Sequence, residues 1–145
     1  VWQQLSEGEE SVHLAQWPGV ETRFLDEELA ERWDAFFNVR KEVAKALELA
    51  RTEKVIGSSN DAAVELYVEG EVAELLQSME GELPDLFIVS GVELHSRENI
   101  PADALEGEEV AVLVRHAQGG KCPRCWKYYE EMANDVCHRC ASALK

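Results

Sequence analysis

Residues 25–54 read LDEELAERWDAFFNVRKEVAKALELARTEK, and this stretch sets the plan of the fold. Its apolar side chains recur at alternating spacings of three and four residues once position 40 is included, which predicts one long amphipathic helix. Acidic residues fill the first turn, and Arg51 and Lys54 stand in the last, which is the distribution of charge that the helix dipole favours. Gly57 follows as a stop signal. The apolar seam consists of Leu29, Trp33, Phe36, Val43, Leu47 and Ala50.

Arg40 interrupts this seam. At 100° per residue, Arg40, Arg51 and Lys54 lie within about 60° of one another, on the side that also carries apolar residues. Two interpretations stay open. The aliphatic stems can cover the apolar stripe while the charged heads reach water or carboxylates. Alternatively, the three cations form a row directed at RNA phosphates.

Beyond Gly57 the apolar pattern changes to a period of two, which is typical of strands. The sequence predicts a short helix over residues 71–79 and a polar surface loop over residues 96–108. Strands are expected over residues 62–68, 86–94 and 109–116. The fold class is therefore α+β, with a long amphipathic helix followed by a small α/β unit and a C-terminal lobe that holds four cysteines.

All four cysteines lie in the last 24 residues, as Cys122-Pro-Arg-Cys125 and Cys137-His-Arg-Cys140, with 11 residues between the pairs. Two residues between thiolates permit a tight turn in which both sulfurs reach one ion. Two such turns supply four ligands to Zn²⁺ in a tetrahedral arrangement, at about 2.3 Å each. No coordination position stays open for water, so we expect a structural zinc ion on which folding of the lobe depends.

Four cysteines can also serve other purposes. Disulfides are disfavoured in a cytosolic chain, and a redox Cys-x-x-Cys normally stands alone on an α/β scaffold. Tetrahedral sulfur coordination also suits iron, so a rubredoxin-like electron carrier stays open. We expect His138, between the last two ligands, to be exposed and not to bind the metal.

Cations alternate with aromatic residues around the ligands. This pattern suits unpaired RNA bases, which stack on rings while phosphates meet the basic groups. Trp126 and Tyr128 can equally pack the small lobe, and the two roles can coexist because a ring has two faces. The surrounding residues are Lys121, Arg124, Trp126, Lys127, Tyr128, Tyr129 and Arg139.

The charge is unevenly distributed. The chain has 14 Lys and Arg against 29 Asp and Glu, for a net charge of −15, which argues against broad affinity for nucleic acid. Residues 115–145, however, hold six basic and three acidic groups, so they form a locally basic segment on an acidic carrier. No apolar run approaches the roughly 18 residues needed to span a bilayer, and no signal peptide is evident, so we expect a cytoplasmic protein without a membrane partner.

Three blocks of sequence resemble the C-terminal region of bacterial-type isoleucyl-tRNA synthetases. Residues 121–128 with 137–140 resemble that family's zinc lobe, and residues 10–14 with Trp17-Pro18 resemble the exit from its helical anticodon-binding domain. The blocks 39–43, 46–48, 50–51 and 55–57, with Ser59, resemble its long helix and the following loop. The chain departs from the family at residues 60–63, where Asn-Asp-Ala-Ala replaces a Leu-Glu-Ala pattern that often carries a Lys.

The resemblance implies a ligase that joins isoleucine to its tRNA with ATP and Mg²⁺ bound in upstream domains. The class I signatures His-Ile-Gly-His and Lys-Met-Ser-Lys-Ser do not occur in this sequence, so we expect a noncatalytic region that helps to hold the anticodon region of the tRNA. The expected divisions are the tail of the anticodon-binding domain (1–20), a junction domain (21–117) and the zinc lobe (118–145). The expected RNA contacts are Lys121, Arg124, Trp126, Lys127 and Arg139, and on the helix Arg40, Arg51 and Lys54.

A different class of function competes with this interpretation. A zinc-ribbon module whose long helix docks a protein partner would have no role in RNA binding. The acidic net charge supports that alternative.

Overall fold

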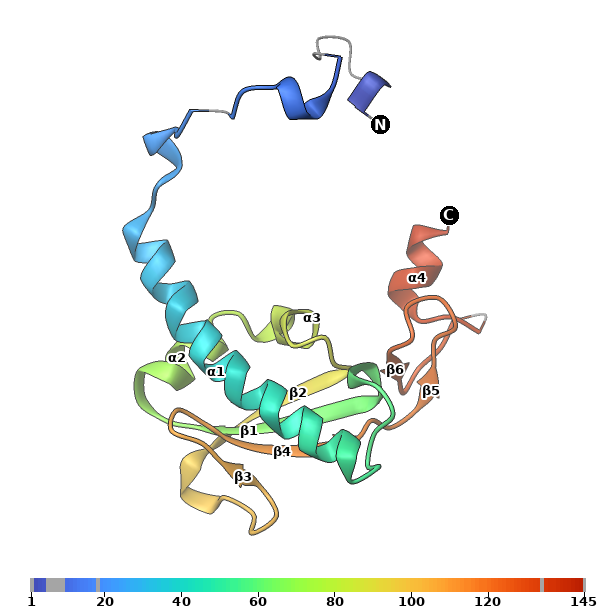
Figure 1. Ribbon diagram of the computed structural model, residues 1–145. Helices are drawn as coiled ribbons and strands as arrows, with labels where there is room; N and C mark the ends of the chain where they lie inside the picture. Colours follow the sequence, from blue (N-terminus) through green and yellow to red (C-terminus); the bar gives the residue numbers. More distant parts are fainter. Residues whose placement is uncertain (1, 5–9, 18, 134, 145) are drawn as a thin grey trace.

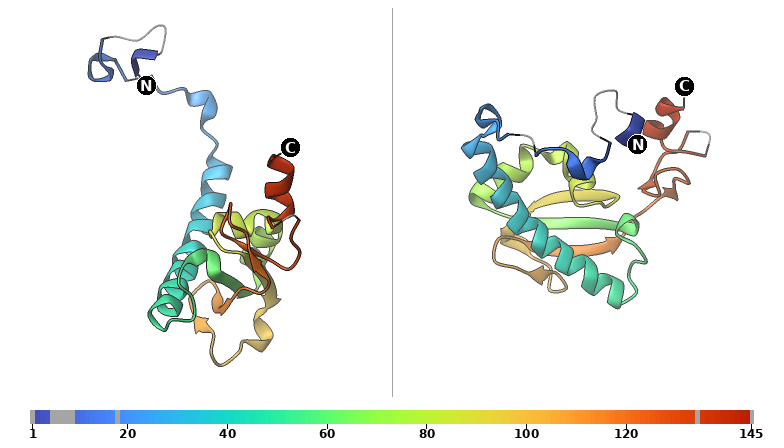
Figure 2. Two further views of the ribbon diagram at one scale, coloured as in Figure 1. Left: turned by 90° about the vertical axis from the view of Figure 1, so that its right-hand side faces the viewer. Right: turned by 45° about the horizontal axis from the view of Figure 1, so that its top comes forward.

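A computed structural model describes residues 2–4, 10–17, 19–133 and 135–144 of the chain. A long helix crosses one face of a four-stranded sheet, and a small lobe with the C-terminal helix lies beside the sheet (Figure 1). The first half of the long helix and the C-terminal helix project beyond the same edge of the sheet in both views of Figure 2. Within the described residues, no helix is both long enough and apolar enough to cross a membrane.

The long helix, α1, spans Glu27–Thr52, which confirms the prediction to within two residues at each end. It begins at Asp26, whose side chain accepts a hydrogen bond from the backbone N–H of Leu29 at 2.9 Å. It ends before Lys54, which takes a left-handed conformation with φ of 62°.

The buried seam of α1 runs through Val39, so the expectation that Arg40 interrupts it was wrong. Val39 is fully buried, whereas Arg40 is exposed. The spacing of three and four residues is preserved when position 39 takes the place of position 40, and the arginine lies beside the seam. The buried residues of α1 are Phe36, Val39, Val43, Ala46, Leu47 and Ala50.

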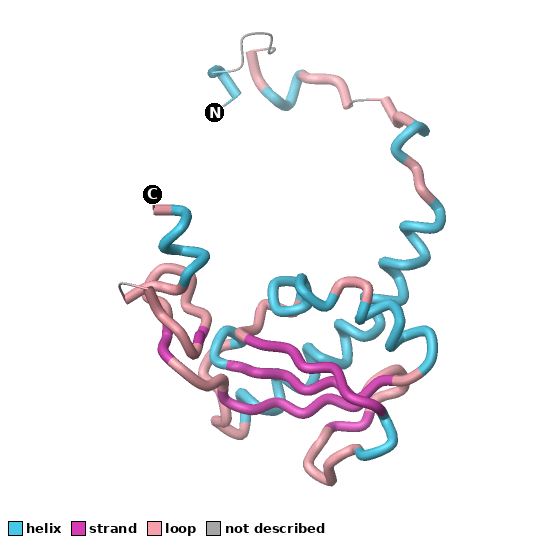
Figure 3. Tube along the Cα trace, turned by 180° about the vertical axis from the view of Figure 1, so that it is seen from behind, coloured by secondary structure: helices cyan, strands magenta, loops and turns pink. Residues whose placement is uncertain are grey.

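The sheet has the strand order β2-β1-β4-β3. Strand β1 (Ala62–Val68) pairs in parallel with β2 (Gly91–Ser96) and antiparallel with β4 (Ala111–His116). A short strand, β3 (Leu105–Glu106), pairs with the outer edge of β4. Helix α1 passes behind the sheet in Figure 3, and on the opposite face Tyr67, Ala111 and Leu113 pack with Ile100 and Ala104.

Alternate side chains of β1 face α1 and form the core. Val64, Leu66 and Val68 are buried there together with Phe36 and Val112. Burying a side chain of this size stabilises the fold by about 1.5–3 kcal/mol. The small α/β unit and the long helix therefore share one core.

The connection from β1 to β2 contains two helices. Helix α2 (Gly70–Gln77) matches the helix expected at 71–79. Helix α3 (Leu83–Leu86) occupies the start of the strand expected over 86–94, so that prediction was wrong before Gly91. Pro84 stands in the first turn of α3, where proline is well tolerated, and the following turn places Ile88 at a φ of 60°. Phe87 and Val89 of this apolar run are buried in a turn rather than in a strand, while Ile88 is exposed.

Single turns of 3₁₀ helix occur at several places between these elements. Two of them, Trp2–Gln4 and Val12–Leu14, fall in the tail expected at 1–20, of which residues 1, 5–9 and 18 lie outside the described part. The loop expected at 96–108 contains strand β3 and another such turn, Arg97–Asn99. The other three turns are Thr22–Phe24, Ser59–Asp61 and Glu80–Glu82.

Candidate metal centre

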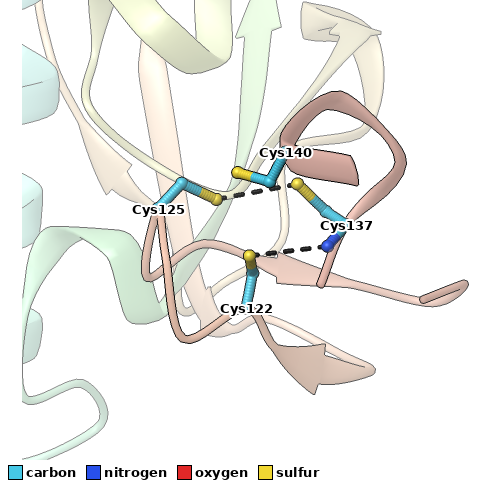
Figure 4. Close-up of side chains that lie close together, drawn as sticks. All are labelled: Cys122, Cys125, Cys137 and Cys140. Atoms are coloured by element: carbon cyan, nitrogen blue, oxygen red, sulfur yellow. Dashed lines mark hydrogen bonds between the residues drawn. The ribbon is translucent and has the colours of Figure 1, made fainter. Parts of the chain in front are cut away.

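The four cysteine sulfurs converge at one point of the C-terminal lobe (Figure 4). All four Sγ atoms lie within 4.8 Å of one another, and the Sγ atoms of Cys125 and Cys137 are 3.8 Å apart. A tetrahedral ion with metal–sulfur bonds of about 2.3 Å holds its sulfurs about 3.8 Å apart. The cluster therefore has the dimensions needed to hold one metal ion.

The first cysteine pair lies on a tight turn between two short strands, β5 (Gly120–Lys121) and β6 (Tyr128–Tyr129). The backbone N–H of Trp126 donates to the carbonyl oxygen of Cys122 at 2.8 Å, which closes the turn. Trp126 takes a left-handed φ of 65°. The turn thus aims both sulfurs at the same point and fixes the backbone of the tryptophan.

The second pair lies at the start of helix α4 (His138–Ala143). The backbone N–H of Cys137 donates to the sulfur of Cys122 at 3.4 Å, so the two pairs are linked through the backbone. His138 is exposed, as expected, and its Nε2 lies 3.9 Å from a carboxylate oxygen of Glu131. It takes no part in the sulfur cluster.

The pKa values of the Cys122 and Cys140 thiols indicate that the four sulfurs can all be deprotonated only when a cation is bound. Burial alone would raise the pKa of the Cys122 thiol, but the amides of Cys125, Cys137 and Arg124 outweigh burial and bring its pKa to about 6. Arg124 lowers the pKa of Cys140, yet burial and the neighbouring sulfurs raise it to about 11. Four sulfurs this close do not all become thiolates unless a cation offsets their charge.

Two of the predicted RNA-binding residues, Trp126 and Arg124, are exposed on the outside of the first turn. The Trp126 side chain is 63% exposed, so it does not pack the interior of the lobe. Arg124 is also exposed, and its Nη1 donates to the sulfur of Cys140 at 3.4 Å. Tyr128 is half-buried and packs edge-on against His116, with ring centroids 5.1 Å apart. Packing and base stacking were both possible for Trp126 and Tyr128, and of these two rings it is Tyr128 that packs in the structure.

Two further predicted cations contact one carboxylate of helix α3, that of Asp85. Lys127 Nζ donates to the carbonyl oxygen of Pro84 at 2.9 Å and forms an ion pair with Asp85. The Lys127 side chain is only 12% exposed. Arg139, which is exposed, lies 3.1 Å from a carboxylate oxygen of Asp85.

Lys121 docks the lobe at a second place. Its Nζ donates to Oδ1 of Asp61 at 2.8 Å, and that carboxylate is nearly buried. The hydrogen bond from Lys121 lowers the pKa of the Asp61 carboxyl below its ordinary value of 3.8, although burial opposes the shift. The sequence pattern gave no sign of Asp61 or Asp85 as partners, because each lies more than 40 positions from the lysine that it pairs with.

The helix cations lie apart from the sulfur cluster. Arg40 and Arg51 line a groove of about 250 Å³ together with Phe87 and Ile88, whereas Lys54 is not among its lining residues. The Nε of Arg40 donates to the carbonyl oxygen of Leu86 at 3.3 Å. Arg51 forms an ion pair with Glu48 and donates to the hydroxyl of Ser59 at 3.3 Å. The structure thus groups two of the three helix cations on one groove.

Comparison with known proteins assigns the family. A family profile described as the anticodon-binding domain of tRNA ligase matches residues 1–66. The isoleucine–tRNA ligase of Desulforamulus reducens is 49% identical over 142 residues, which cover 93% of this chain and 15% of that protein. The isoleucine–tRNA ligase of Natranaerobius thermophilus is 43% identical over 155 residues, which cover 100% of this chain and 17% of that protein.

A third relative agrees with these two. The isoleucine–tRNA ligase of Moorella thermoacetica is 44% identical over 144 residues, which cover 93% of this chain and 16% of that protein. The chain thus spans about one sixth of the length of the relatives that it matches. It belongs to the family of bacterial-type isoleucyl-tRNA synthetases, in which it corresponds to the C-terminal region.

Proposed function

We propose that this chain is the noncatalytic, tRNA-binding C-terminal region of a cytoplasmic isoleucine–tRNA ligase. In this proposal it helps to position the anticodon region of the tRNA, while ATP and Mg²⁺ act in the catalytic domain of the complete ligase. The anticodon-binding profile over residues 1–66 and the names of the relatives support a tRNA-binding region. Upstream domains of the same polypeptide are its other partners.

The four cysteines, Cys122, Cys125, Cys137 and Cys140, would hold one structural Zn²⁺. Bound there, the ion supplies a tetrahedral cross-link and leaves no coordination position for water or substrate. Its contribution is to the folding of the lobe, because the single guanidinium of Arg124 on the Cys140 sulfur does not offset the charge of four clustered thiolates.

The main support for an RNA contact is the exposed indole of Trp126. A large apolar ring that stays in water, on a backbone held by the metal turn, is preorganised for contact with another molecule. Stacking of an unpaired base on such a ring contributes about 1–3 kcal/mol. Arg124 lies two residues away and would meet the phosphate of the same nucleotide.

The remaining basic residues would extend this contact. Arg139 is exposed, and its guanidinium would contact a phosphate while it keeps its ion pair with Asp85. Lys121 and Lys127 would act mainly by holding the lobe in place, because both ammonium groups already bind carboxylates. On the long helix the proposed contacts are Arg40, Arg51 and Lys54.

A protein-docking role is the second candidate, and two observations favour it. The net charge is −15, and apolar side chains such as Trp17, Phe24 and Leu25 are exposed before and at the start of α1. In that case the interaction would bury apolar surface and would depend little on salt.

Salt dependence separates the two candidates. We expect the affinity of the complete ligase for tRNA to fall with salt, and Arg124→Ala to reduce the log–log slope by about one. Arg115→Ala is the matched control, because Arg115 is exposed but lies on the sheet face opposite α1 and pairs with Glu65 at 3.2 Å. An unchanged slope in Arg124→Ala, or the same decrease in both variants, would refute the RNA contact.

A further inference from the structure

Residues 84–90, which we call the bridge segment, contact both groups of cations. From one side, the Nε of Arg40 on α1 donates to the carbonyl oxygen of Leu86 at 3.3 Å. From the other side, Lys127 of the metal lobe donates to the carbonyl oxygen of Pro84 at 2.9 Å. The bridge segment therefore links the arginine groove of α1 to the lobe that carries Trp126.

The end of the bridge segment makes a second link to the lobe. The backbone N–H of Tyr128 donates to the hydroxyl of Ser90 at 2.7 Å, and this hydroxyl donates to the carbonyl oxygen of Asn60 at 2.5 Å. Since Tyr128 lies in strand β6, next to the metal turn, these hydrogen bonds join the lobe to the bridge segment and to the residue before Asp61.

Asp85 is the charged centre of the bridge segment. Its carboxylate accepts hydrogen bonds from both Lys127, which follows the first cysteine pair, and Arg139, which lies within the second pair. The ammonium of Lys127 is nearly buried, and a buried charge requires a partner of opposite sign. One carboxylate thus restrains two separate parts of the lobe and opposes its rotation against the sheet.

We propose that Asp85 is a positioning residue that holds the metal lobe at a fixed orientation to α1, so that Trp126 and the arginine groove meet one tRNA together. The inference rests on the proposed function. Asp85 touches no reacting atom. It acts through Lys127 and Arg139 by lowering the ordering cost of binding a ligand that spans both surfaces.

Kinetics of the complete ligase test this role. We expect Asp85→Asn to raise the KM for tRNA about threefold to tenfold, with a smaller change in kcat, because the ion pairs with Lys127 and Arg139 and the lobe orientation are lost. Asp85→Glu, which keeps the charge, should recover most of the loss. Asp103→Asn is the matched control. Asp103 is as exposed as Asp85, at 63% against 61%, but pairs at 3.6 Å with Arg115 on the opposite sheet face.

Amide hydrogen exchange separates a change of orientation from unfolding of the lobe. In Asp85→Asn the Tyr128 amide should exchange faster, because its bond to the bridge segment is loosened. The Cys137 amide, which donates to a sulfur inside the cluster, should keep its protection, and the zinc content should stay at one per chain.

Asp85→Asn with wild-type KM and wild-type exchange at Tyr128 would overturn the inference, as would loss of zinc or of Cys137 protection, which would give Asp85 a merely structural role. Arg124→Ala measured in parallel keeps the two proposals distinguishable. If Arg124→Ala raises the KM but Asp85→Asn does not, only the positioning role fails. If neither variant raises it, the proposed function fails.

Discussion

The carboxylate of Glu42 on α1 anchors the turn that leads into β4. Its Oε1 accepts backbone hydrogen bonds from Glu108 and Glu109 at 2.9 and 3.2 Å, and its Oε2 accepts one from Val110 at 3.0 Å. A Cβ atom at Gly107 would overlap the same carboxylate, so the turn approaches it closely. We predict that Glu42→Gln destabilises the protein measurably.

The size of the effect follows from which bonds survive. A glutamine oxygen can keep the two bonds of Oε1, but its NH₂ group would face the Val110 amide, so that two donors meet. Val110 is fully buried, and water cannot replace the lost acceptor there. A lost hydrogen bond to a charged group costs about 1.5–3 kcal/mol when its partner stays buried. Since the two bonds to Oε1 survive and only the bond from Val110 is lost, we expect a total of about 2 kcal/mol.

Urea unfolding measures this loss, and Glu31→Gln is the matched control. Glu31 lies on the same helix and is exposed, so its substitution should change the free energy of unfolding by less than about 0.5 kcal/mol. The Val110 amide should also exchange faster in Glu42→Gln. If Glu42→Gln were no less stable than Glu31→Gln, the proposed anchoring by Glu42 would be refuted.

Three further predictions concern the core, the lobe and pH. Leu66→Ala, at a fully buried position of β1, should lower the free energy of unfolding by about 2–5 kcal/mol, and Leu49→Ala, at an exposed position of α1, by much less. A strong chelator should unfold the residues after about Gly119 and leave the helical circular dichroism of α1 largely intact; loss of the whole fold would place the domain boundary elsewhere. The Asp61 carboxyl has a lowered pKa in the folded protein. Its ionised form therefore stabilises the fold at pH values above its ordinary pKa of 3.8, and this contribution is lost as the pH falls through the pKa of the folded state. The difference in stability between the wild type and Asp61→Asn should therefore narrow below about pH 4, and a constant difference from pH 7 to pH 3 would contradict the role of the Lys121–Asp61 pair.

The features that the sequence predicted are those with a local signature. The periodicity of residues 25–54 defines α1 because an amphipathic helix repeats its apolar positions within a few turns. The spacing of the cysteine pairs predicts the sulfur cluster because each turn closes within four residues.

The features that the sequence did not predict depend on contacts between distant residues. Residues 86–90 are as apolar as a strand, but Phe87 and Val89 are buried in a turn that α3 starts. The docking pair of Asp85 and Lys127 joins residues 42 positions apart, and Glu42 reaches Val110 across 68 positions. Such pairs leave no periodic pattern, because nothing in either segment alone shows which carboxylate the other will meet.

The tRNA dependence of aminoacylation by the complete ligase carrying Trp126→Ala tests the central claim most directly. Loss of one stacked base predicts a rise in the KM for tRNA of about fivefold to a hundredfold, with the zinc content unchanged. A wild-type KM together with a full complement of zinc would show that the metal-held tryptophan does not contact the tRNA.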